Sequence, residues 1–244
     1  MKALNSILSL FYPHTCPVCG KYLSENEQEQ EHLEWICSDC LRKLPRTEQL
    51  WLRENSTETS ILDESSNLVR EKKILHLDKA AAYLFYEKGK PVQHLVHLMK
   101  YSERPQIGYY LARQAVLDTQ DTDFFDNIDV IIPMPLHPKR LRERGYNQSE
   151  YIARGLSEIT QIPVDTTHVL RTKNTPKQAL QTGEGRKTNV ENAFAVNHPE
   201  QMYHKHILVV DDLVTTGETM RSCLKAMKTF RGAKISVFSL CRTR

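Results

Sequence analysis

The sequence has few glycines, no long apolar run and almost no net charge, and these absences exclude several classes of protein. Of its 244 residues, nine are glycine, 40% are hydrophobic and 26% are charged. This composition excludes a fibrous or disordered chain and is typical of a globular protein with one or two domains. No stretch approaches the roughly 18 uninterrupted apolar residues of a membrane helix, so we expect no membrane span.

The N-terminal segment, residues 1–12, lacks the features of a signal peptide. Asn5, Ser6 and Ser9 interrupt its apolar residues, and it leads into a cysteine motif without a small-residue cleavage site. Its apolar residues lie at helical spacing, which predicts a short amphipathic helix. We therefore expect a cytoplasmic protein.

The net charge of +3 conceals two parts of opposite sign. Residues 1–78 hold nine basic and thirteen acidic residues, a balance of −4, whereas residues 79–244 hold 24 basic and 17 acidic residues, a balance of +7. This difference indicates an acidic module joined to a basic one.

The acidic part contains two C-x2-C pairs, Cys16 with Cys19 and Cys37 with Cys40, separated by seventeen residues. Two such pairs can complete a tetrahedral shell of four thiolates, which suits Zn²⁺. The alternatives are an iron–sulfur centre, a redox pair or two disulfides; the spacing favours zinc, and disulfides fit poorly without a secretory signal. Four cysteine ligands leave no open position, so we expect a structural site. Cys223 and Cys241 are predicted to be buried free cysteines.

The pattern of residues divides the chain into three parts. Residues 1–46 are predicted to form the zinc-binding module, residues 47–78 a polar linker with some helix, and residues 79–244 an α/β domain. In that domain, apolar strands alternate with helices of ten or more residues, which predicts a parallel sheet flanked by helices. The strands are expected at 80–86, 129–132, 207–210 and 234–240, and the helices at 92–101, 107–117, 147–160 and from a turn after the third strand to about 230.

The strongest chemical signal is the segment 207–219, which reads ILVVDDLVTTGET. An apolar strand delivers Asp211 and Asp212 to its carboxyl end, where open α/β sheets bind ligands. The turn and helix N-terminus that follow predict a cradle for a phosphate, and Gly217 lets the backbone approach it. Carboxylates beside such a cradle suit a sugar phosphate. The simpler alternative, an acidic turn with a threonine cap, is disfavoured by the match over thirteen consecutive positions.

This segment resembles the phosphoribosyl-pyrophosphate (PRPP) motif of type I phosphoribosyltransferases, and residues 131–138, IIPMPLHP, stand where that family has its pyrophosphate loop. The closer resemblance is to the ComF family, which is linked to DNA uptake and natural competence. It rests on the four-cysteine module, on residues 133–135 followed by RGYNQ at 144–148, and on matching residues in the segment 186–194. It covers nearly the whole chain except residues 47–78.

The resemblance implies a set of PRPP-binding residues, together with Mg²⁺ bridging the diphosphate. The two carboxylates would hold the ribose hydroxyls and be catalytic, the threonines and glycine would hold the 5′-phosphate, and the arginines would face the pyrophosphate. These residues are Asp211, Asp212, Thr215, Thr216, Gly217, Thr219, Arg140 and Arg144.

The segment from Lys139 to Lys187 is the most basic part of the chain, with ten basic and five acidic residues. A charge run is usually a solvated surface. Two functional alternatives are neutralisation of a departing pyrophosphate and a groove for single-stranded DNA, with Tyr146 or Tyr151 available for stacking.

These observations leave three hypotheses for the function. The first is an enzyme that transfers ribose 5-phosphate from PRPP to a nitrogen acceptor that the sequence does not identify. The second is a DNA-uptake factor that binds PRPP or a related nucleotide, contacts DNA through residues after 138, and contacts competence or recombination proteins through the zinc module. The third, a scaffold with a relic site, is disfavoured by the intact residues Asp211, Asp212 and Gly217.

Overall fold

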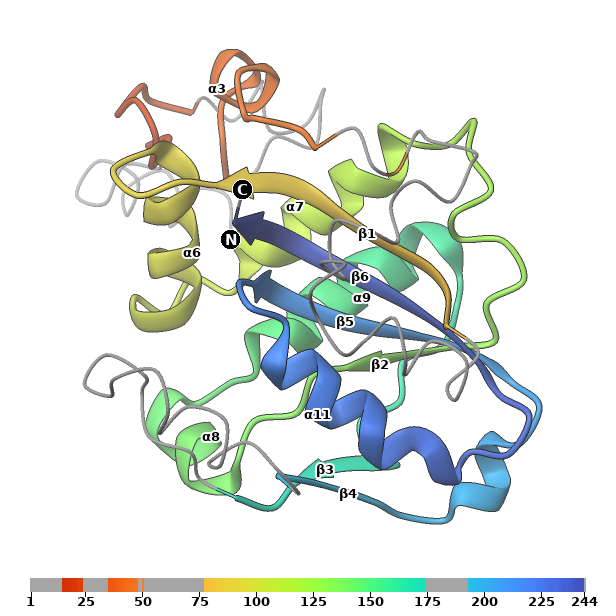
Figure 1. Ribbon diagram of the computed structural model, residues 1–244. Coiled ribbons are helices and arrows are strands. Elements are labelled where there is room, and N and C mark those ends of the chain that lie inside the picture. The colour runs from red at the N-terminus through yellow and green to blue at the C-terminus, as the bar shows by residue number, and fades with distance from the viewer. Residues whose placement is uncertain (1–14, 24–34, 48–49, 51–76, 174–192, 244) are drawn as a thin grey trace, which may run out of the picture.

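The computed structural model describes residues 15–23, 35–47, 50, 77–173 and 193–243. Four parallel strands form one sheet in the order β1–β6–β5–β2 (Figure 1). They are β1 (Leu77–Tyr86), β2 (Val130–Pro133), β5 (His206–Val214) and β6 (Lys234–Thr243). A separate antiparallel pair comprises β3 (Val169–Arg171) and β4 (Phe194–Val196).

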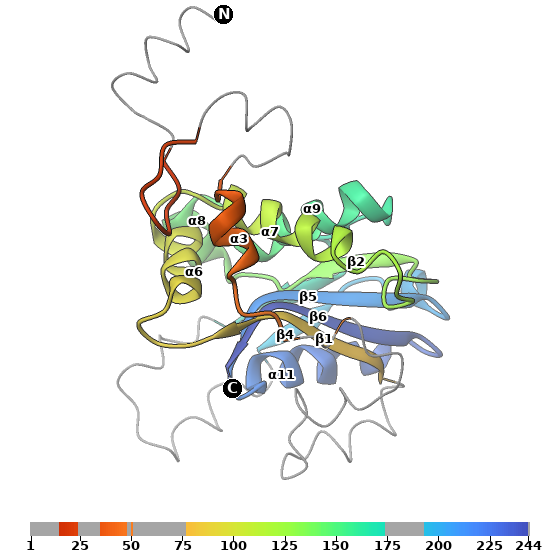
Figure 2. The ribbon, with the colours of Figure 1, turned by 90° about the horizontal axis from the view of Figure 1, so that it is seen from above.

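Helices cover both faces of the sheet (Figure 2). One face carries α6 (Pro91–Tyr101), α7 (Gln106–Leu117) and α9 (Gln148–Thr160), and the other carries α11 (Glu218–Ala226). Shorter elements complete the described chain: α3 (Ser38–Arg42), α8 (Pro138–Arg144) and the 3-10 turns Pro199–Met202 and Met227–Thr229. The predicted α/β fold, a parallel sheet flanked by helices, is confirmed.

The sheet separates two apolar cores, because successive side chains of a strand point to opposite faces. In β5, Leu208 and Val210 pack in the core under α6, α7 and α9, whereas Ile207 and Val209 pack in the core under α11. All four are fully buried. A continuous apolar run is the expected pattern for a strand covered on both faces.

The predicted strands and long helices all form, with small differences at their ends. Strand β2 includes Pro133, which occupies the last position of an edge strand, where its missing N–H leaves no gap in the ladder. Helix α11 ends at Ala226, and a 3-10 turn continues to Thr229 in place of the expected helix. Cys223 and Cys241 are buried and free, as predicted.

The end of the cysteine-containing segment is attached to the edge strand β1. The backbone N–H of Phe85 donates to Pro45 O at 2.8 Å, and the N–H of Thr47 donates to Tyr83 O at 3.0 Å. Apolar side chains of residues 35–50 share a core with those of α6, α7 and β1. The segment therefore packs on the sheet and extends its edge.

Two predictions lie largely or wholly outside the described residues: the helix at 1–12 and the linker at 47–78. The basic residues Lys177, Arg186 and Lys187 also lie outside them. Within the described part of the chain, every helix is too short or too polar to cross a membrane.

Candidate phosphate-binding site and cysteine cluster

The carboxyl ends of the parallel strands β2 and β5 lie side by side at a switch point of the sheet, where the helices that follow the two strands lie on opposite faces. The two strands are neighbours, with Pro133 opposite Val210. The helix α9 that follows β2 lies on one face of the sheet, whereas α11, which follows β5, lies on the other (Figure 2). In open α/β sheets, ligands bind in the crevice between such strands.

The two predicted carboxylates lie at this point. Asp211 is buried, and its Oδ1 accepts hydrogen bonds from Ser149 Oγ at 3.2 Å and from the backbone N–H of Asp212 at 2.8 Å. Asp212 is also buried, and its Oδ2 lies 2.7 Å from Lys100 Nζ. Burial and the neighbouring charge of Asp212 raise the pKa of Asp211 to about 7. The pair therefore shares one strong counter-ion, Lys100.

The turn after β5 leads directly into the N-terminus of helix α11. Thr215 and Thr216 are exposed, and Gly217 is the N-cap of α11 with φ 72°, a left-handed conformation that favours glycine. Thr219 lies in the first turn of the helix and is half-buried. The first N–H groups of a helix have no partner within it and favour an anion. The structure thus places the four predicted phosphate-binding residues together, in the turn after β5 and the first turn of α11, directly after the strand that carries the carboxylates.

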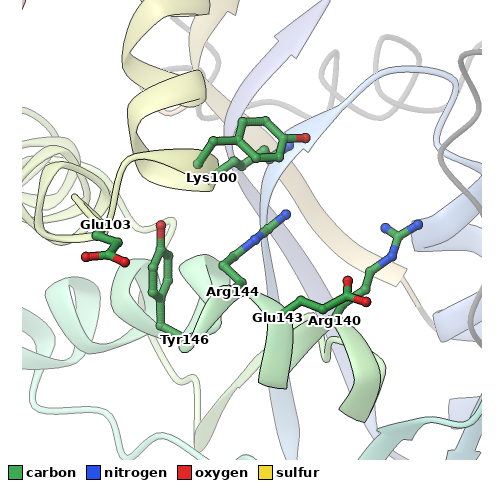
Figure 3. A pocket seen from close by; sticks show the side chains of 7 residues that line it. Lys100, Glu103, Arg140, Glu143, Arg144 and Tyr146 are labelled. Atoms are coloured by element: carbon green, nitrogen blue, oxygen red, sulfur yellow. The ribbon is translucent and has the colours of Figure 1, made fainter.

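A basic pocket of about 280 Å³ opens beside Lys100 (Figure 3). Its lining comes from the end of α6, from α8 and from the loop before α9. These residues are Lys100, Tyr101, Glu103, Arg140, Glu143, Arg144 and Tyr146.

The aromatic residues hold the pocket in shape. The Arg144 guanidinium lies 5.5 Å from the centroid of the Tyr101 ring, a cation–π contact, and also donates to Gln148 Oε1. Tyr146 donates a hydrogen bond to the backbone carbonyl of Met99 at 2.7 Å. Arg144 and Arg140 are one helical turn apart and project from the same side of α8 (Figure 3). The two predicted arginines therefore line one pocket with Lys100.

Three further residues of this region were missed by the sequence reasoning. Lys100 pairs with Asp212, Ser149 donates to Asp211, and the half-buried guanidinium of Arg171 interacts electrostatically with Arg140 and Asp211. Burial and Arg140 lower the pKa of Arg171. Arg171 lies within the basic segment from Lys139 to Lys187, where its neighbours do not single it out, and Lys100 has the pattern of any lysine at the end of an amphipathic helix. The fold alone brings them to the site.

The site offers oxygen donors of the kind that Mg²⁺ prefers, the carboxylates of Asp211 and Asp212. Both carboxylates already have partners within the protein, Ser149 and Lys100 respectively. The residues therefore fit a Mg²⁺ ion that would take most of its oxygen ligands from a bound molecule.

The four predicted cysteine ligands also lie together. The sulfur atoms of Cys16, Cys19, Cys37 and Cys40 are all within 4.8 Å of one another, and the Sγ atoms of Cys19 and Cys37 are 3.7 Å apart. Four sulfurs at about 2.3 Å from a tetrahedral Zn²⁺ are about 3.8 Å apart. The cluster is compatible with zinc.

The thiols of the cluster lie in unequal surroundings. A hydrogen bond from the backbone of Lys21, with help from Cys40, lowers the pKa of Cys19 to about 7, whereas burial raises the pKa of Cys37 and of Cys40. A thiol with a lowered pKa is the one that releases its proton most readily when a metal binds.

Comparisons with known proteins agree with this description. The phosphoribosyl transferase domain family matches residues 145–244. The DNA utilization protein YhgH of Escherichia coli K12 is 33% identical over 156 residues, which is 63% of this chain and 68% of the relative. Competence protein F of Haemophilus influenzae is 33% identical over 158 residues, 63% and 69% of the two chains.

Among solved structures, a glutamine PRPP amidotransferase from B. subtilis in complex with ADP and GMP superposes with a TM-score of 0.39 at 16% identity, over 59% of this chain and 30% of that one. A hypoxanthine-guanine phosphoribosyl transferase of L. donovani gives 0.32 at 14% identity, over 56% and 67%. The assignment rests on the sequence relatives YhgH and Competence protein F. The chain belongs to the ComF family and has a phosphoribosyltransferase domain in its C-terminal part.

Proposed function

We propose that this protein binds PRPP or a related nucleotide with Mg²⁺ at the carboxyl ends of β2 and β5, and that it serves DNA uptake in the bacterial cytoplasm. The observation that carries the proposal is the buried pair Asp211 and Asp212, flanked on one side by the Gly217 turn and on the other by the basic pocket. A sugar that carries a phosphate at one end and a diphosphate at the other matches an acidic centre between two anion sites.

Each part of the site has a chemical task in this proposal. The carboxylates accept hydrogen bonds from the ribose hydroxyls, and the N–H groups around Gly217 with the hydroxyls of Thr215, Thr216 and Thr219 donate to the 5′-phosphate. Arg140 and Arg144 neutralise the diphosphate, to which Mg²⁺ supplies further charge neutralisation when it is bound.

Calorimetry with PRPP, with and without Mg²⁺, tests the site. We expect wild-type protein to bind PRPP, and the variant with both Asp211→Asn and Asp212→Asn to bind it at least about tenfold more weakly, since charged hydrogen bonds contribute about 1.5–3 kcal/mol each. The amide keeps the size of the side chain, so folding is preserved. No binding by the wild type, or equal binding by both proteins, contradicts the assignment.

A glycine substitution tests the 5′-phosphate cradle separately. Gly217→Ala places a Cβ at φ 72° in the turn, which costs about 1–2 kcal/mol and moves the backbone N–H groups. We expect roughly tenfold weaker binding of ribose 5-phosphate by calorimetry. Gly89→Ala is the matched control: Gly89 has φ 75°, nothing near its missing Cβ, and lies in the loop before α6. It should lose similar stability and keep its affinity.

We further propose that the basic face around α8 contacts single-stranded DNA. Lys139 and Arg142 are exposed on α8, apart from the pocket lining. Replacing both by Glu should weaken binding of an oligothymidine and reduce its salt dependence, measured by fluorescence anisotropy. The acidic module 1–46 should repel phosphates, so its removal should leave DNA affinity intact; a loss would contradict this part of the proposal.

The zinc-binding module, residues 1–46, is proposed as the contact for competence or recombination proteins. The same proposal divides the chain into this module, a linker at residues 47–78 and the phosphoribosyltransferase-like domain at residues 79–244. Zn²⁺ in the four-cysteine cluster would have a structural task, because four thiolates complete its coordination.

The alternative is an active phosphoribosyltransferase. The observation that favours it is a second hollow of about 500 Å³ next to the basic pocket, on the other face of α8, with the carbon-rich side chains of Pro133, Pro135, Leu136, Leu141 and Leu170 in its wall. In the reaction, the acceptor nitrogen would form a bond to C1 of the ribose and lose a proton, and pyrophosphate would leave with the electrons of the C1–O bond. Release of labelled pyrophosphate in the presence of candidate amines or bases distinguishes turnover from binding alone.

A further inference from the structure

Lys100 lies between the acidic pair and the basic pocket. Its Nζ is 2.7 Å from Asp212 Oδ2, and the two side chains are 21% and 5% exposed. The same lysine lines the pocket that contains Arg140 and Arg144. Helix α6 supplies it, and the sequence signature at 207–219 gives no sign of it.

The charges around Lys100 explain why it is held there. Burial by itself lowers the pKa of a lysine, but the carboxylates of Asp212 and Asp211 outweigh this and raise the pKa of Lys100, so the ammonium stays charged. An ammonium carries one unit of positive charge, and here its ion-pair partner is the Asp212 carboxylate. Because Lys100 also lines the pocket, an anion bound there would draw on the same charge.

We propose that Lys100 is a positioning residue shared by the two halves of the site. It is the counter-ion of Asp212 and, at the same time, the third cation of the basic pocket, so that a bound diphosphate and Asp212 compete for its ammonium. The inference rests on the proposed function and deepens it, because it names the residue through which the ribose-binding carboxylates and the diphosphate subsite influence each other.

Competition for one ammonium has a measurable consequence. When the Asp212 carboxylate is removed, the positive charge of Lys100 is no longer neutralised by it and attracts an anion in the pocket more strongly. Asp212→Asn should therefore tighten the binding of inorganic pyrophosphate, although the same substitution contributes to the loss of PRPP. Without Lys100, the substitution of Asp212 should have a smaller effect on pyrophosphate, because only the direct repulsion between this carboxylate and the anion is then removed.

The experiment is a double-mutant cycle with inorganic pyrophosphate as the ligand, measured by calorimetry. We expect Lys100→Met to weaken pyrophosphate binding about tenfold, the loss of one charged hydrogen bond. We expect Asp212→Asn to tighten it roughly fivefold in the wild-type background and by less than about twofold in the Lys100→Met background. This non-additivity is the signature of a shared group.

Two controls distinguish a shared ammonium from the general field of the site. Glu143 lines the same pocket, so Glu143→Gln also removes a negative charge near the anion, yet its effect should be the same in both backgrounds. Lys90→Met removes an exposed positive charge at the other end of α6 and should leave pyrophosphate affinity unchanged.

The outcomes are separable. No pyrophosphate binding by the wild type overturns the proposed function and this inference with it. Binding with additive effects of Lys100→Met and Asp212→Asn overturns the inference alone. Where thermal melting shows that Lys100→Met does not fold, because Asp212 is left buried without a counter-ion, Asp212→Asn is compared with the double variant, which has no unpaired charge. Equal affinities of those two proteins also overturn the inference.

Discussion

The cysteine cluster and the candidate phosphate-binding site are assembled in opposite ways. The four cysteines come from two short segments within 16–40, each of which supplies a complete pair. The candidate phosphate-binding site takes Lys100 from α6, Arg140 and Arg144 from α8, and its carboxylates from β5. The first is built by local spacing and the second by the fold.

The difference extends to what each site can do. Four sulfur ligands complete the coordination of a zinc ion and leave no place for a substrate. The carboxylates at the end of β5 have a hydrogen-bonding serine and a lysine as partners, and they open onto a pocket. A closed, local site stabilises its own segment, whereas an open site assembled from distant elements can bind a ligand and depends on the whole sheet.

The largest effect is expected from loss of the metal. Cys37→Ser should abolish binding of one zinc per chain, measured by elemental analysis, and lower Tm by roughly 10 °C or more, since structural zinc contributes about 10 kcal/mol to small metal-dependent folds. Well below the transition, pyrophosphate affinity should stay within about threefold, because the seven pocket residues lie outside the module.

Cys223→Ala is the matched control, because Cys223 is a fully buried free cysteine on the α11 side of the sheet. It should keep its zinc. A large loss of pyrophosphate affinity in Cys37→Ser, measured on folded protein, would show that the two regions are coupled and would contradict the contrast drawn above.

Much of the fold follows from the sequence. The strands β1, β5 and β6 and the helices α6, α7 and α9 are apolar runs or strongly periodic segments, and their positions agree to within a few residues. Helix α8 was not predicted, because PKRLRER buries no side chain and so carries no apolar period. The β3–β4 pair was also missed, because each strand has three residues and its partner lies far along the chain.

The site could be predicted only in part, for the same reason. The acidic pair, the Gly217 turn and the cysteine pairs are each contiguous in sequence, so their residue types reveal their chemistry. Lys100, Ser149 and Arg171 reach the site through tertiary packing. Ser149 directly follows the RGYNQ motif and Arg171 lies in the basic segment, but their interactions with Asp211 depend on the fold.

A smaller effect is expected at the connection between the two regions. Asp118 Oδ2 accepts from Tyr83 OH at 2.5 Å and lies 3.1 Å from Arg46 Nη2, which joins the end of the cysteine-containing segment to the sheet. Burial and the Asp118 carboxylate raise the pKa of Tyr83, so its hydroxyl remains a donor. Asp118→Ala leaves that buried hydroxyl without its acceptor.

We expect Asp118→Ala to lower the free energy of unfolding by about 2 kcal/mol in urea titrations. Zinc content and pyrophosphate affinity should not change, because Asp118 belongs neither to the residues that line the pocket nor to the cysteine cluster. Asp121→Ala, at an exposed position in the following turn, should have almost no effect. Loss of zinc from the Asp118 variant would indicate that the cysteine cluster depends on the sheet, contrary to its local assembly.

The smallest effect is that of pH. A rise in pH should reduce the stability that protonated Asp211 contributes and should favour metal binding by the cysteine thiolates. The pKa of Asp211 is about 7, above the value of about 4 in an unfolded chain. Its protonated form therefore contributes stability that is complete below about pH 4 and is lost as the pH rises to 7. Zinc-binding thiolates work in the other direction, because metal binding releases protons and is favoured as the pH rises.

The difference between wild type and Asp211→Asn isolates the first contribution, since the zinc-linked protons are common to both proteins. That difference in unfolding free energy should decrease from pH 5 to 7. PRPP affinity should change the opposite way, increasing about tenfold from pH 6 to 8 in the wild type, because only the ionised carboxylate accepts from both ribose hydroxyls while the fraction ionised rises from about 10% to about 90%. In Asp211→Asn the weak residual affinity should rise less steeply, because only the phosphates of the ligand, with a second pKa of about 6, then titrate in this range. An equal slope in both proteins would assign the titration to a group other than Asp211.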